Sequence, residues 1–230
     1  EGGFNNKKRR NLIGFWGITK ISRSEKGNKN MREIERMLSG RLYYASDSNL
    51  RDAYIRAKRL VHMFNQCAYS NKDKAALILK DLLGSSGTNI QIEPPFRCDY
   101  GSNITVGDNF YANYDCVILD VCEVKIGSNV MFGPRVCLFT AAHPIDVEVR
   151  NSGLEYGRPI SVGDNVWIGG CVTVNPGIKI GNDVVIGSGS VVTKSIPDGV
   201  VAAGNPCKVL RKIDEHDRLF WQSLQYERMQ

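Results

Sequence analysis

Histidine is scarce in this sequence, which has only His62, His143 and His216 among its 230 residues. The seven cysteines are odd in number, and no two of them form a C-x-x-C pair. We therefore expect neither a metal site nor a disulfide framework, and a reducing cytoplasm is the natural compartment. The chain also lacks an apolar run of the roughly 18–20 residues that a transmembrane helix needs, and it shows no N-terminal secretory pattern.

Positive charge is not a property of the whole chain, because the formal charge of +6 belongs to residues 1–30. That segment holds eight Lys or Arg and two Glu, and the rest of the chain is neutral in sum. A basic segment of this kind can bind nucleic acid or an anionic membrane. The simpler interpretation is a disordered or artificially added leader that ends before Met31, so we expect no nucleic-acid or membrane partner.

Residues 31–85 show the periodicity of amphipathic helices. The apolar residues on one helical face are Leu50, Tyr54, Ala57, Val61 and Phe64. Their spacing of three or four positions predicts a helix that packs on the neighbouring domain. Ser70 and Asp73 resemble a capping box for a second helix, and Gly84 is a natural stop.

Residues 86–212 carry an aliphatic residue at every sixth position. The longest ladder is Val162, Ile168, Val174, Ile180, Ile186 and Val192, and the shorter ones are Val106, Ala112, Ile118 and Ile126, Phe132, Leu138. Two extra residues separate the shorter ladders, and an insertion at 144–161 interrupts the pattern again. Ordinary strands and helices have periods of 2 and 3.6 residues, so the sixfold period indicates a repeat architecture.

A hexapeptide has room for one short strand and one tight corner, so three hexapeptides close a triangular coil. The aliphatic side chain points into the prism, and the glycine or asparagine beside it permits the corner backbone. Stacked coils bury a continuous core that no single coil can form alone. We therefore predict a mainly β protein: a parallel β-helix at 86–212 with a helical segment before it. Residues 213–230 are expected to form a capping helix, with Asp214 as its N-cap and with its apolar contact made by Leu219, Phe220 and Trp221.

Function is expected where the ladder is interrupted, because a ladder alone specifies a scaffold. The chief interruption begins at Thr140 and contains His143, the one histidine within the repeat. Its imidazole is the side chain there that can act as a base at neutral pH. Taken alone, a loop histidine is more often a surface residue than a catalytic base.

Five segments of the chain resemble those of the maltose and galactoside O-acetyltransferases, which transfer an acetyl group from acetyl-CoA to a sugar hydroxyl. In chain order they are FRCDYGSNI (96–104), FYANYD (110–115), AHP (142–144), GDNVWIGG (163–170) and AAGNP (202–206). The resemblance covers about residues 31–213. It implies a left-handed β-helix, although the usual crossover rule favours the right-handed form, and a homotrimer with active sites between neighbouring prisms.

The resemblance also implies roles for individual residues. His143 would be the general base that takes a proton from the sugar hydroxyl, and Asn113 would bind the acceptor and stabilise the transition state. Asp99, Tyr111 and Asp120 would contact the sugar. The coenzyme would be bound by Trp167, Gly170, Ser188, Thr193, Lys194, Lys208 and Arg211, with the cations facing its phosphates.

Several of these residues also have a purely structural interpretation. Asn113 suits a corner with a left-handed backbone, Trp167 can cover the prism surface, and a surface Lys or Arg is usually solvated. A γ-class carbonic anhydrase on the same scaffold is excluded, because its zinc needs three solenoid histidines. Two alternatives remain: an acetyltransferase for an antibiotic or another xenobiotic, and a non-catalytic scaffold.

Departures from the family concern the acceptor. Galactoside-type members have paired acidic residues where this chain has Asp120 and Val121, and an acidic residue where Ala45 stands. The loop at 151–157 is closer to maltose-type members, which favours a glucose or maltose acceptor. Whether Glu155 in this loop orients the catalytic base is left open by the sequence.

Overall fold

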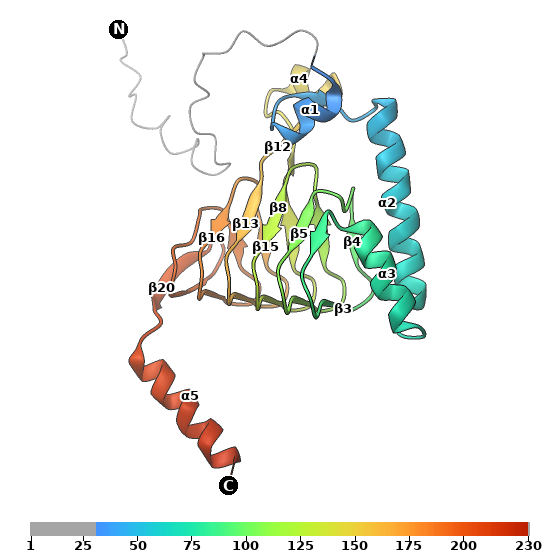
Figure 1. The fold of residues 1–230 in the computed structure, drawn as a ribbon. Helices are drawn as coiled ribbons and strands as arrows, with labels where there is room; N and C mark the ends of the chain where they lie inside the picture. The colour runs from blue at the N-terminus through green and yellow to red at the C-terminus, as the bar shows by residue number, and fades with distance from the viewer. Residues whose placement is uncertain (1–30, 230) are drawn as a thin grey trace, which may run out of the picture.

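The structure is a computed structural model in which residues 31–229 are described. The basic segment at 1–30, interpreted above as a leader, lies outside the described residues. Figure 1 shows a stack of short strands with two helices beside its N-terminal end, a group of loops above one edge, and one helix projecting from its C-terminal end. Within 31–229, no helix has the length and apolar character needed to cross a membrane.

The N-terminal segment packs against the first coil of the stack. It contains α1 (Glu33–Leu38), α2 (Ser48–Cys67) and α3 (Lys72–Leu82). The predicted face of α2 is buried, except that Tyr54 remains 41% exposed. α3 begins one residue later than predicted, because Asn71 and not Ser70 is its N-cap; the Asn71 side chain accepts a hydrogen bond from Lys74 N at 2.9 Å.

Three sheets form the sides of the prism, and we name them after the three strands of the third coil. The β8 sheet contains β16 (Lys179–Ile180), β13 (Ile160–Val162), β8 (Val124–Ile126), β5 (Ile104–Val106) and β2 (Ser85–Ser86). The β9 sheet contains β20 (Lys208–Lys212), β19 (Val200–Ala203), β17 (Val185–Ile186), β14 (Trp167–Ile168), β9 (Met131–Phe132), β6 (Tyr111–Ala112) and β3 (Gln91–Ile92). The β10 sheet contains β18 (Val191–Val192), β15 (Thr173–Val174), β10 (Cys137–Phe139), β7 (Val117–Leu119) and β4 (Arg97–Cys98). Neighbouring strands are parallel, except that β20 is antiparallel to β19.

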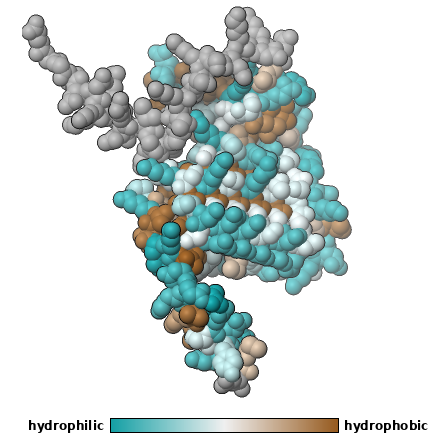
Figure 2. Space-filling model, turned by 60° about the vertical axis from the view of Figure 1, so that its left-hand side comes forward, coloured by the Kyte–Doolittle hydropathy of each residue, from teal (hydrophilic) through white to brown (hydrophobic). Residues whose placement is uncertain are grey.

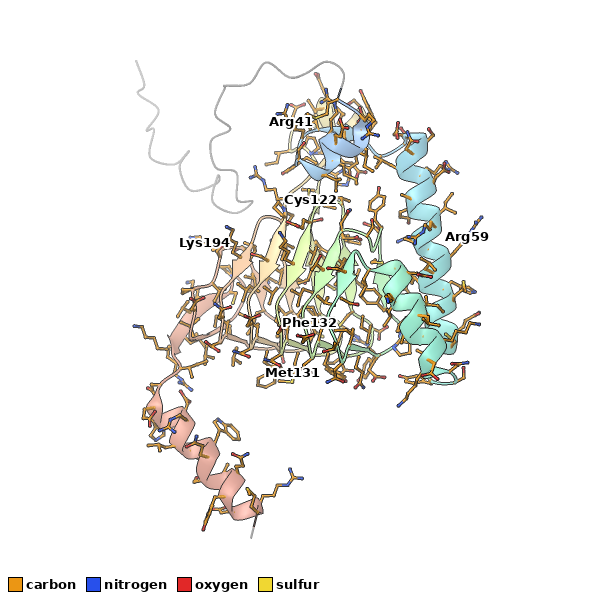
Figure 3. The ribbon with its side chains drawn as sticks, in the orientation of Figure 1. Arg41, Arg59, Cys122, Met131, Phe132 and Lys194 are labelled. Atoms are coloured by element: carbon orange, nitrogen blue, oxygen red, sulfur yellow. The ribbon has the colours of Figure 1, made fainter. Side chains whose placement is uncertain are left out.

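The aliphatic ladders form the core, which confirms the predicted β-solenoid. Leu138 pairs with Ile118 on one side and with Val174 on the other, so the inward side chains of successive coils stack on one another. Every residue of the three ladders is buried. Figure 3 shows the alternation within one strand, where Phe132 points into the prism and Met131 points away from it.

The glycines beside the ladder have a different role from the predicted one. Positive φ angles do not occur at Gly163 or Gly169 but two residues later, at Asn165 (58°) and Cys171 (59°). A Cβ atom on Gly163 would lie 2.8 Å from the carbonyl group of Gly181 in the next coil. These glycines therefore permit close stacking of the coils, while the residues with positive φ permit the corner.

Asparagine side chains stack along the corner between the β8 and β9 sheets. Hydrogen bonds of 2.9–3.0 Å connect each side chain to the next coil in the order Asn89, Asn109, Asn129, Asn165 and Asp183. All five residues have φ angles of 55–58°. Asn and Asp are the non-glycine residues that adopt this conformation most readily, so backbone preference and hydrogen bonding fix the same corner.

The C-terminal helix α5 (Glu215–Arg228) forms, but it does not cap the prism. Asp214 is its N-cap, as predicted, and accepts hydrogen bonds from the backbone of His216 and Asp217. The expected apolar contact is absent, because the exposed fractions of Leu219, Phe220 and Trp221 are 55%, 51% and 66%. The last coil is closed instead by β20, which folds back on β19, and Figure 1 shows α5 pointing away from the stack.

Candidate functional site

Three interruptions of the repeat lie at one corner of the prism, between the β10 and β8 sheets. β4, β7 and β10 pair in register, so the residues that follow them (Asp99, Asp120 and Thr140) are neighbours along the stack. Strands of the first three coils are 20 residues apart instead of 18, and the insertion at 144–161 leaves from this same corner. The fold thus brings together, at one corner, three interruptions of the repeat that are far apart in the sequence.

Asp120 is fully buried, and its carboxylate organises this corner. Its Oδ1 accepts hydrogen bonds from the backbone N–H groups of Asp99 (3.0 Å) and Tyr100 (2.9 Å), and Oδ2 accepts one from Asn103 N (3.4 Å). Burial outweighs these donors and raises the pKa of Asp120 to about 7. A carboxylate without an exposed atom positions the loop and does not reach a sugar, contrary to the predicted contact.

The insertion folds into a small sheet above this corner. The sheet contains β1 (Tyr43–Tyr44), β12 (Leu154–Gly157) and β11 (Ala141–Ala142), and α4 (Val147–Asn151) lies between the last two strands in the chain. Figure 1 shows β12, α4 and α1 together above the solenoid. The buried Thr140 anchors the base of the insertion, because its hydroxyl donates to Leu119 O (2.6 Å) and accepts from Cys122 N (3.0 Å).

His143 directly follows β11, and its side chain is exposed. Among residues 31–229, no hydrogen bond or ion pair is formed by its imidazole. Glu155 does not orient it in this structure, since Glu155 Oε2 accepts a hydrogen bond from the Tyr43 hydroxyl at 3.0 Å. The histidine is therefore positioned by the backbone of the hairpin that β11 and β12 form, and both of its ring nitrogens are available for hydrogen bonding.

A cavity of about 450 Å³ lies between α2, the hairpin and the corner. Its wall includes the carboxylates of Asp99 and Glu155 and the rings of Tyr43, Tyr54 and Tyr100. Apolar surface with a few convergent polar groups is typical of small-molecule sites. Aromatic rings can stack on a sugar ring, and carboxylates can accept hydrogen bonds from its hydroxyls.

Two tyrosines of this cavity, Tyr43 and Tyr100, are held as neutral phenols. Burial is the main reason that the pKa of Tyr43 is raised far above its usual value, and the negative charge of Glu155 adds to the effect. Burial, followed by the charge of Asp99, does the same to the pKa of Tyr100. The ring of Tyr54 packs edge-on against that of Tyr100, with 6.3 Å between centroids. The wall therefore keeps its hydroxyl donors and its shape across the neutral pH range.

Tyr111 and Asn113 lie at a different place from His143. Tyr111 is on the outer face of the β9 sheet, and Asn113 follows β6 at the corner between the β9 and β10 sheets. Its Oδ1 accepts a hydrogen bond from Tyr114 N (2.8 Å), while its amide nitrogen has no partner in the described part of the chain. Because the β10 sheet separates the two corners, a single chain does not bring Asn113 and His143 together.

Trp167 lies in a row with Tyr111 on the outer face of the β9 sheet. Tyr111 pairs with Met131, and Met131 pairs with Trp167, which is 52% exposed. Gly170 at the following corner has no side chain, and a Cβ atom there would lie 3.2 Å from Pro134 O. An exposed ring beside a corner that begins with two glycines, Gly169 and Gly170, fits a slender arm such as that of coenzyme A.

The remaining coenzyme candidates differ in accessibility. Ser188, Lys194 and Lys208 are exposed, and Figure 3 shows Lys194 at the outer edge of the stack. Thr193 is only 7% exposed, so the predicted contact from its side chain is not available in this structure. In 31–229 we find no group of three or more His, Cys, Asp or Glu side chains that could hold a metal ion, and all seven cysteines are free.

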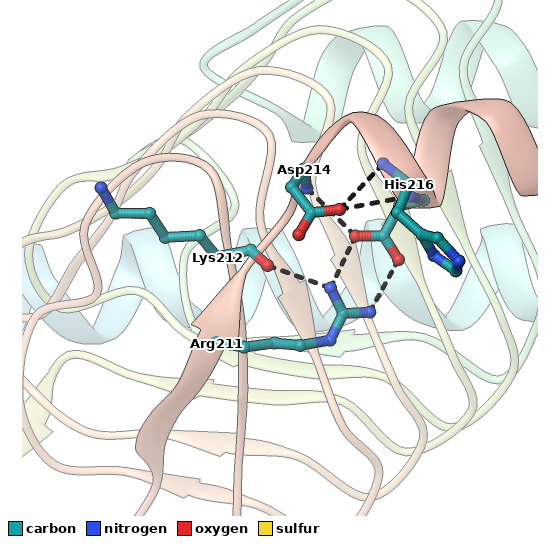
Figure 4. A network of polar contacts seen from close by, with 5 residues as sticks. Arg211, Lys212, Asp214 and His216 are labelled. Carbon is teal, nitrogen blue, oxygen red and sulfur yellow. Dashed lines mark hydrogen bonds and ion pairs between the residues drawn. The ribbon is translucent and has the colours of Figure 1, made fainter.

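Arg211 is already engaged by the C-terminal helix. Its Nη1 and Nη2 atoms contact the two carboxylate oxygens of Asp217 at 2.6 and 2.7 Å, and Nη1 also donates to Lys212 O (Figure 4). This hydrogen-bonded pair lowers the pKa of Asp217 to about 2 and raises the pKa of Arg211. Lys208 and Arg211 are the residues of β20 that are predicted to bind the coenzyme phosphates. Lys208 is accessible, whereas Arg211 would first have to separate from Asp217.

Sequence patterns do not predict the roles of Tyr54 and Lys58 on α2. The helical periodicity places Tyr54 on a buried face, whereas this residue lines the cavity, and the periodicity gives no signal for Lys58. Lys58 Nζ contacts Asp99 Oδ1 at 3.2 Å, across 41 residues of sequence. No local signal predicts such a contact, because it depends on how α2 packs on β4.

Comparison with known proteins agrees with this architecture. The family model described as "Maltose acetyltransferase hexapeptide capping motif" matches residues 36–87, and "Bacterial transferase hexapeptide (six repeats)" matches residues 159–194. The galactoside O-acetyltransferase of Escherichia coli K12 is 43% identical over 192 residues, which cover 84% of this chain and 95% of that protein.

Two solved structures are similar over most of the chain. A maltose O-acetyltransferase from Clostridium difficile 630 is 55% identical, with a TM-score of 0.79, and the match covers 80% of this chain and 99% of that one. A galactoside acetyltransferase in complex with coenzyme A is 43% identical, with a TM-score of 0.80 and coverage of 82% and 94%. The chain therefore belongs to the maltose and galactoside O-acetyltransferase family, acetyl-CoA-dependent enzymes built on hexapeptide repeats.

Proposed function

We propose that this protein transfers the acetyl group of acetyl-CoA to a hydroxyl of a glucose- or maltose-type sugar, with His143 as the general base. The position of His143 carries the proposal. It extends β11 opposite β12, the strand that contributes Glu155 to the cavity wall, and its imidazole is exposed and unpaired in the described chain. An imidazole in this state can accept the proton of a hydroxyl at neutral pH.

The chemistry follows from the groups available. As the sugar oxygen attacks the thioester carbonyl, His143 takes the hydroxyl proton and then returns it to the departing thiolate of the coenzyme. Negative charge develops on the carbonyl oxygen, and the free amide N–H of Asn113 can donate to it. Trp167 and Gly170 would lie along the arm of the coenzyme, with Lys194 and Lys208 near its phosphates.

This mechanism requires a neighbouring protomer, because His143 and Asn113 are at different corners of one chain. Support comes from the outer face of the β10 sheet, whose outward side chains are mostly apolar: Val117, Leu119, Cys137, Phe139 and Val191, with Arg97 and Thr173 as the polar ones. The corresponding positions of the β8 sheet are polar: Thr105, Lys125, Ser161 and Lys179. Figure 2 shows hydrophobic and hydrophilic rows running along one face of the stack. An apolar side of a prism is suited to packing against other copies, and we propose a homotrimer.

The proposed acceptor preference rests on two positions in the cavity wall. Ala45 and Val121 line the cavity, and the family resemblance implies acidic residues at both positions in galactoside-type members. Without these carboxylates the cavity has fewer acceptors for the hydroxyls of a galactoside. Glucose and maltose are therefore the acceptors that we expect to be used best.

Coenzyme release with acetyl-CoA and a panel of sugars tests the proposal. Wild type should acetylate glucose or maltose with a higher kcat/KM than a galactoside, and His143→Ala should lower kcat by at least about 10²-fold. His62→Ala, which removes an exposed imidazole from α2, is the matched control and should keep full activity. Unchanged turnover in His143→Ala would remove this residue as the base. Turnover with aminoglycosides or other xenobiotics but no sugar would favour the alternative acceptor class.

Light scattering tests the trimer. The wild-type particle should have three times the chain mass of 25.6 kDa. Phe139→Glu places a charge on the apolar face of the β10 sheet and should dissociate the particle, with loss of activity. Lys125→Glu on the polar β8 face should change neither property. An active wild-type monomer would contradict the shared site.

A further inference from the structure

We propose that Lys58 is a positioning residue of the acceptor site, where it holds Asp99 so that one carboxylate oxygen remains directed at the sugar. The inference rests on the proposed function, since it assigns the cavity to the acceptor. It goes further by making α2 part of the machinery that sets acceptor affinity.

Lys58 is not a solvated surface cation. Its Nζ contacts Asp99 Oδ1 at 3.2 Å and donates to the Cys98 carbonyl, and it lies 4.3 Å from the centroid of the Tyr54 ring. Its side chain is 37% exposed, which leaves the ammonium partly desolvated among three partners. A cation in such surroundings interacts more strongly than one in bulk water, and the tyrosine ring adds a cation–π contact.

Asp99 is fixed from two sides by these contacts. Its backbone N–H is held by the buried carboxylate of Asp120 at 3.0 Å, and its Oδ1 is held by Lys58. Its Oδ2 has no partner within residues 31–229, and Asp99 lines the cavity with a side chain that is 19% exposed. The result is a carboxylate with one anchored oxygen and one free acceptor.

The packing of α2 explains why this lysine reaches the corner. Ala57, the preceding residue, is fully buried, and its small side chain allows the helix to lie close to the first coil. α2 contacts β4, the strand that ends at Cys98, so the lysine side chain only has to span the gap to the strand end. Arg59, the next residue, is exposed, and Figure 3 shows it pointing away from the stack.

Removal of the ammonium should affect the acceptor and spare the coenzyme. In Lys58→Met, Asp99 loses its charged partner, so its carboxylate can rotate toward solvent and no longer meets the sugar in one geometry. The KM for the sugar should rise about tenfold, the loss expected for one hydrogen bond to a charged group. The KM for acetyl-CoA should not change, and kcat at saturating sugar should change little. Lys58→Arg should recover most of the affinity, because its guanidinium can pair with the carboxylate.

The experiment is steady-state coenzyme release with maltose, run on wild type, Lys58→Met, Lys58→Arg and Arg59→Met. Arg59→Met removes a neighbouring cation from the exposed side of the same helix and should behave as wild type. Lys58→Met is then combined with Asp99→Asn; if the lysine acts through Asp99, the double variant should have the same sugar KM as Asp99→Asn alone.

The outcomes separate this inference from the proposed function. No coenzyme release by wild type with any sugar overturns both. Release by wild type with an equal sugar KM in Lys58→Met, or multiplicative effects of the two substitutions, overturns the role of Lys58 alone. If Lys58→Met does not fold, Lys58→Gln decides the question, since its amide can still donate to the Cys98 carbonyl but carries no charge for Asp99.

Discussion

Arg211 and Asp217 form a bidentate ion pair that connects β20, the last strand of the solenoid, to the C-terminal helix α5. The contacts of 2.6 and 2.7 Å use both carboxylate oxygens, and Asp217 Oδ2 also accepts from Asp214 N at 3.1 Å. The pKa of Asp217, lowered to about 2, keeps the pair charged throughout the neutral range. A residue proposed for the coenzyme phosphates is thus held by the protein's own carboxylate.

Asp217→Asn should release Arg211 for the coenzyme. The amide oxygen can still accept from Asp214 N, but the charge that competes with the phosphates is gone. We expect a severalfold lower KM for acetyl-CoA, most pronounced at low ionic strength because the Arg211 side chain is 54% exposed and salt would screen its charge. Glu215→Gln, which removes a carboxylate paired with Arg218 on the same helix, is the matched control. An unchanged KM in both Asp217→Asn and Arg211→Gln would show that Arg211 takes no part in coenzyme binding.

The asparagine corner offers a test of how much a side-chain ladder stabilises the prism. Asn129 accepts from Asn109 and donates to Asn165, and its φ is 56°. Asn129→Gly keeps the conformation but loses both hydrogen bonds, so the free energy of unfolding should fall by about 1 kcal/mol. Asn129→Ala should cost about a further 1 kcal/mol for the left-handed backbone. Urea unfolding should rank wild type above the glycine variant and the glycine above the alanine variant; equal stability of the two variants would contradict this.

The two kinds of glycine should respond differently to substitution. At Gly163 a Cβ atom would press on Gly181 of the next coil, so Gly163→Ala should destabilise the fold by about 1–3 kcal/mol. At Gly199 φ is +65°, and an added Cβ atom would have no other atom within 4 Å. This glycine occupies the same corner as Asp183, one coil further along the stack. Gly199→Asn should therefore leave the midpoint of thermal unfolding nearly unchanged. A larger loss for Gly199→Asn than for Gly163→Ala would reverse the roles that we assign.

Asp120 should make stability depend on pH. Its folded-state pKa of about 7 lies above the ordinary value of 3.8, so the folded protein holds this proton more tightly than the unfolded chain. The free energy of unfolding should therefore fall as pH rises from about 4 to about 7, by up to about 1.4 kcal/mol per pH unit, and level off above that range.

The comparison is with Asp120→Asn, which cannot titrate. This variant should be less stable than wild type at acidic pH, where Asp120 keeps its proton, because an amide group cannot accept from all three backbone donors. Its stability should nevertheless change less between pH 5 and 7 than that of wild type, since the titrating carboxyl is gone. Parallel stability curves for the two proteins would show that Asp120 is ionised throughout.

The solenoid itself was predictable because its signal is local and repeated. Each coil places its aliphatic side chains inward at fixed intervals, so the register of Val162, Ile168 and Val174 in the sequence is the register of the core. The role of the neighbouring glycines was not predictable in the same way. A glycine is required at these positions because the next coil packs closely against them, as Gly181 does against Gly163. A single hexapeptide does not contain that neighbour.

The candidate site was predictable only in part. The interrupted repeat indicated the segment that carries His143, and family resemblance supplied Asn113 and Trp167. Asp120 illustrates the limit, because its sequence position is compatible with a surface carboxylate while its actual partners are three backbone amides of the preceding coil. The contact of Lys58 with Asp99 lies still further from any local pattern.

By itself, the sequence determined the β-solenoid, the helical segment before it and the place where the repeat is interrupted. Those properties follow from periodic hydrophobicity, which acts between residues a few positions apart. Tertiary structure alone decided that the interruptions share one corner, that α2 and the hairpin enclose a cavity there, and that Asp120 is buried. These depend on coil stacking and helix packing, which join residues 20 or more positions apart through contacts that no short segment encodes.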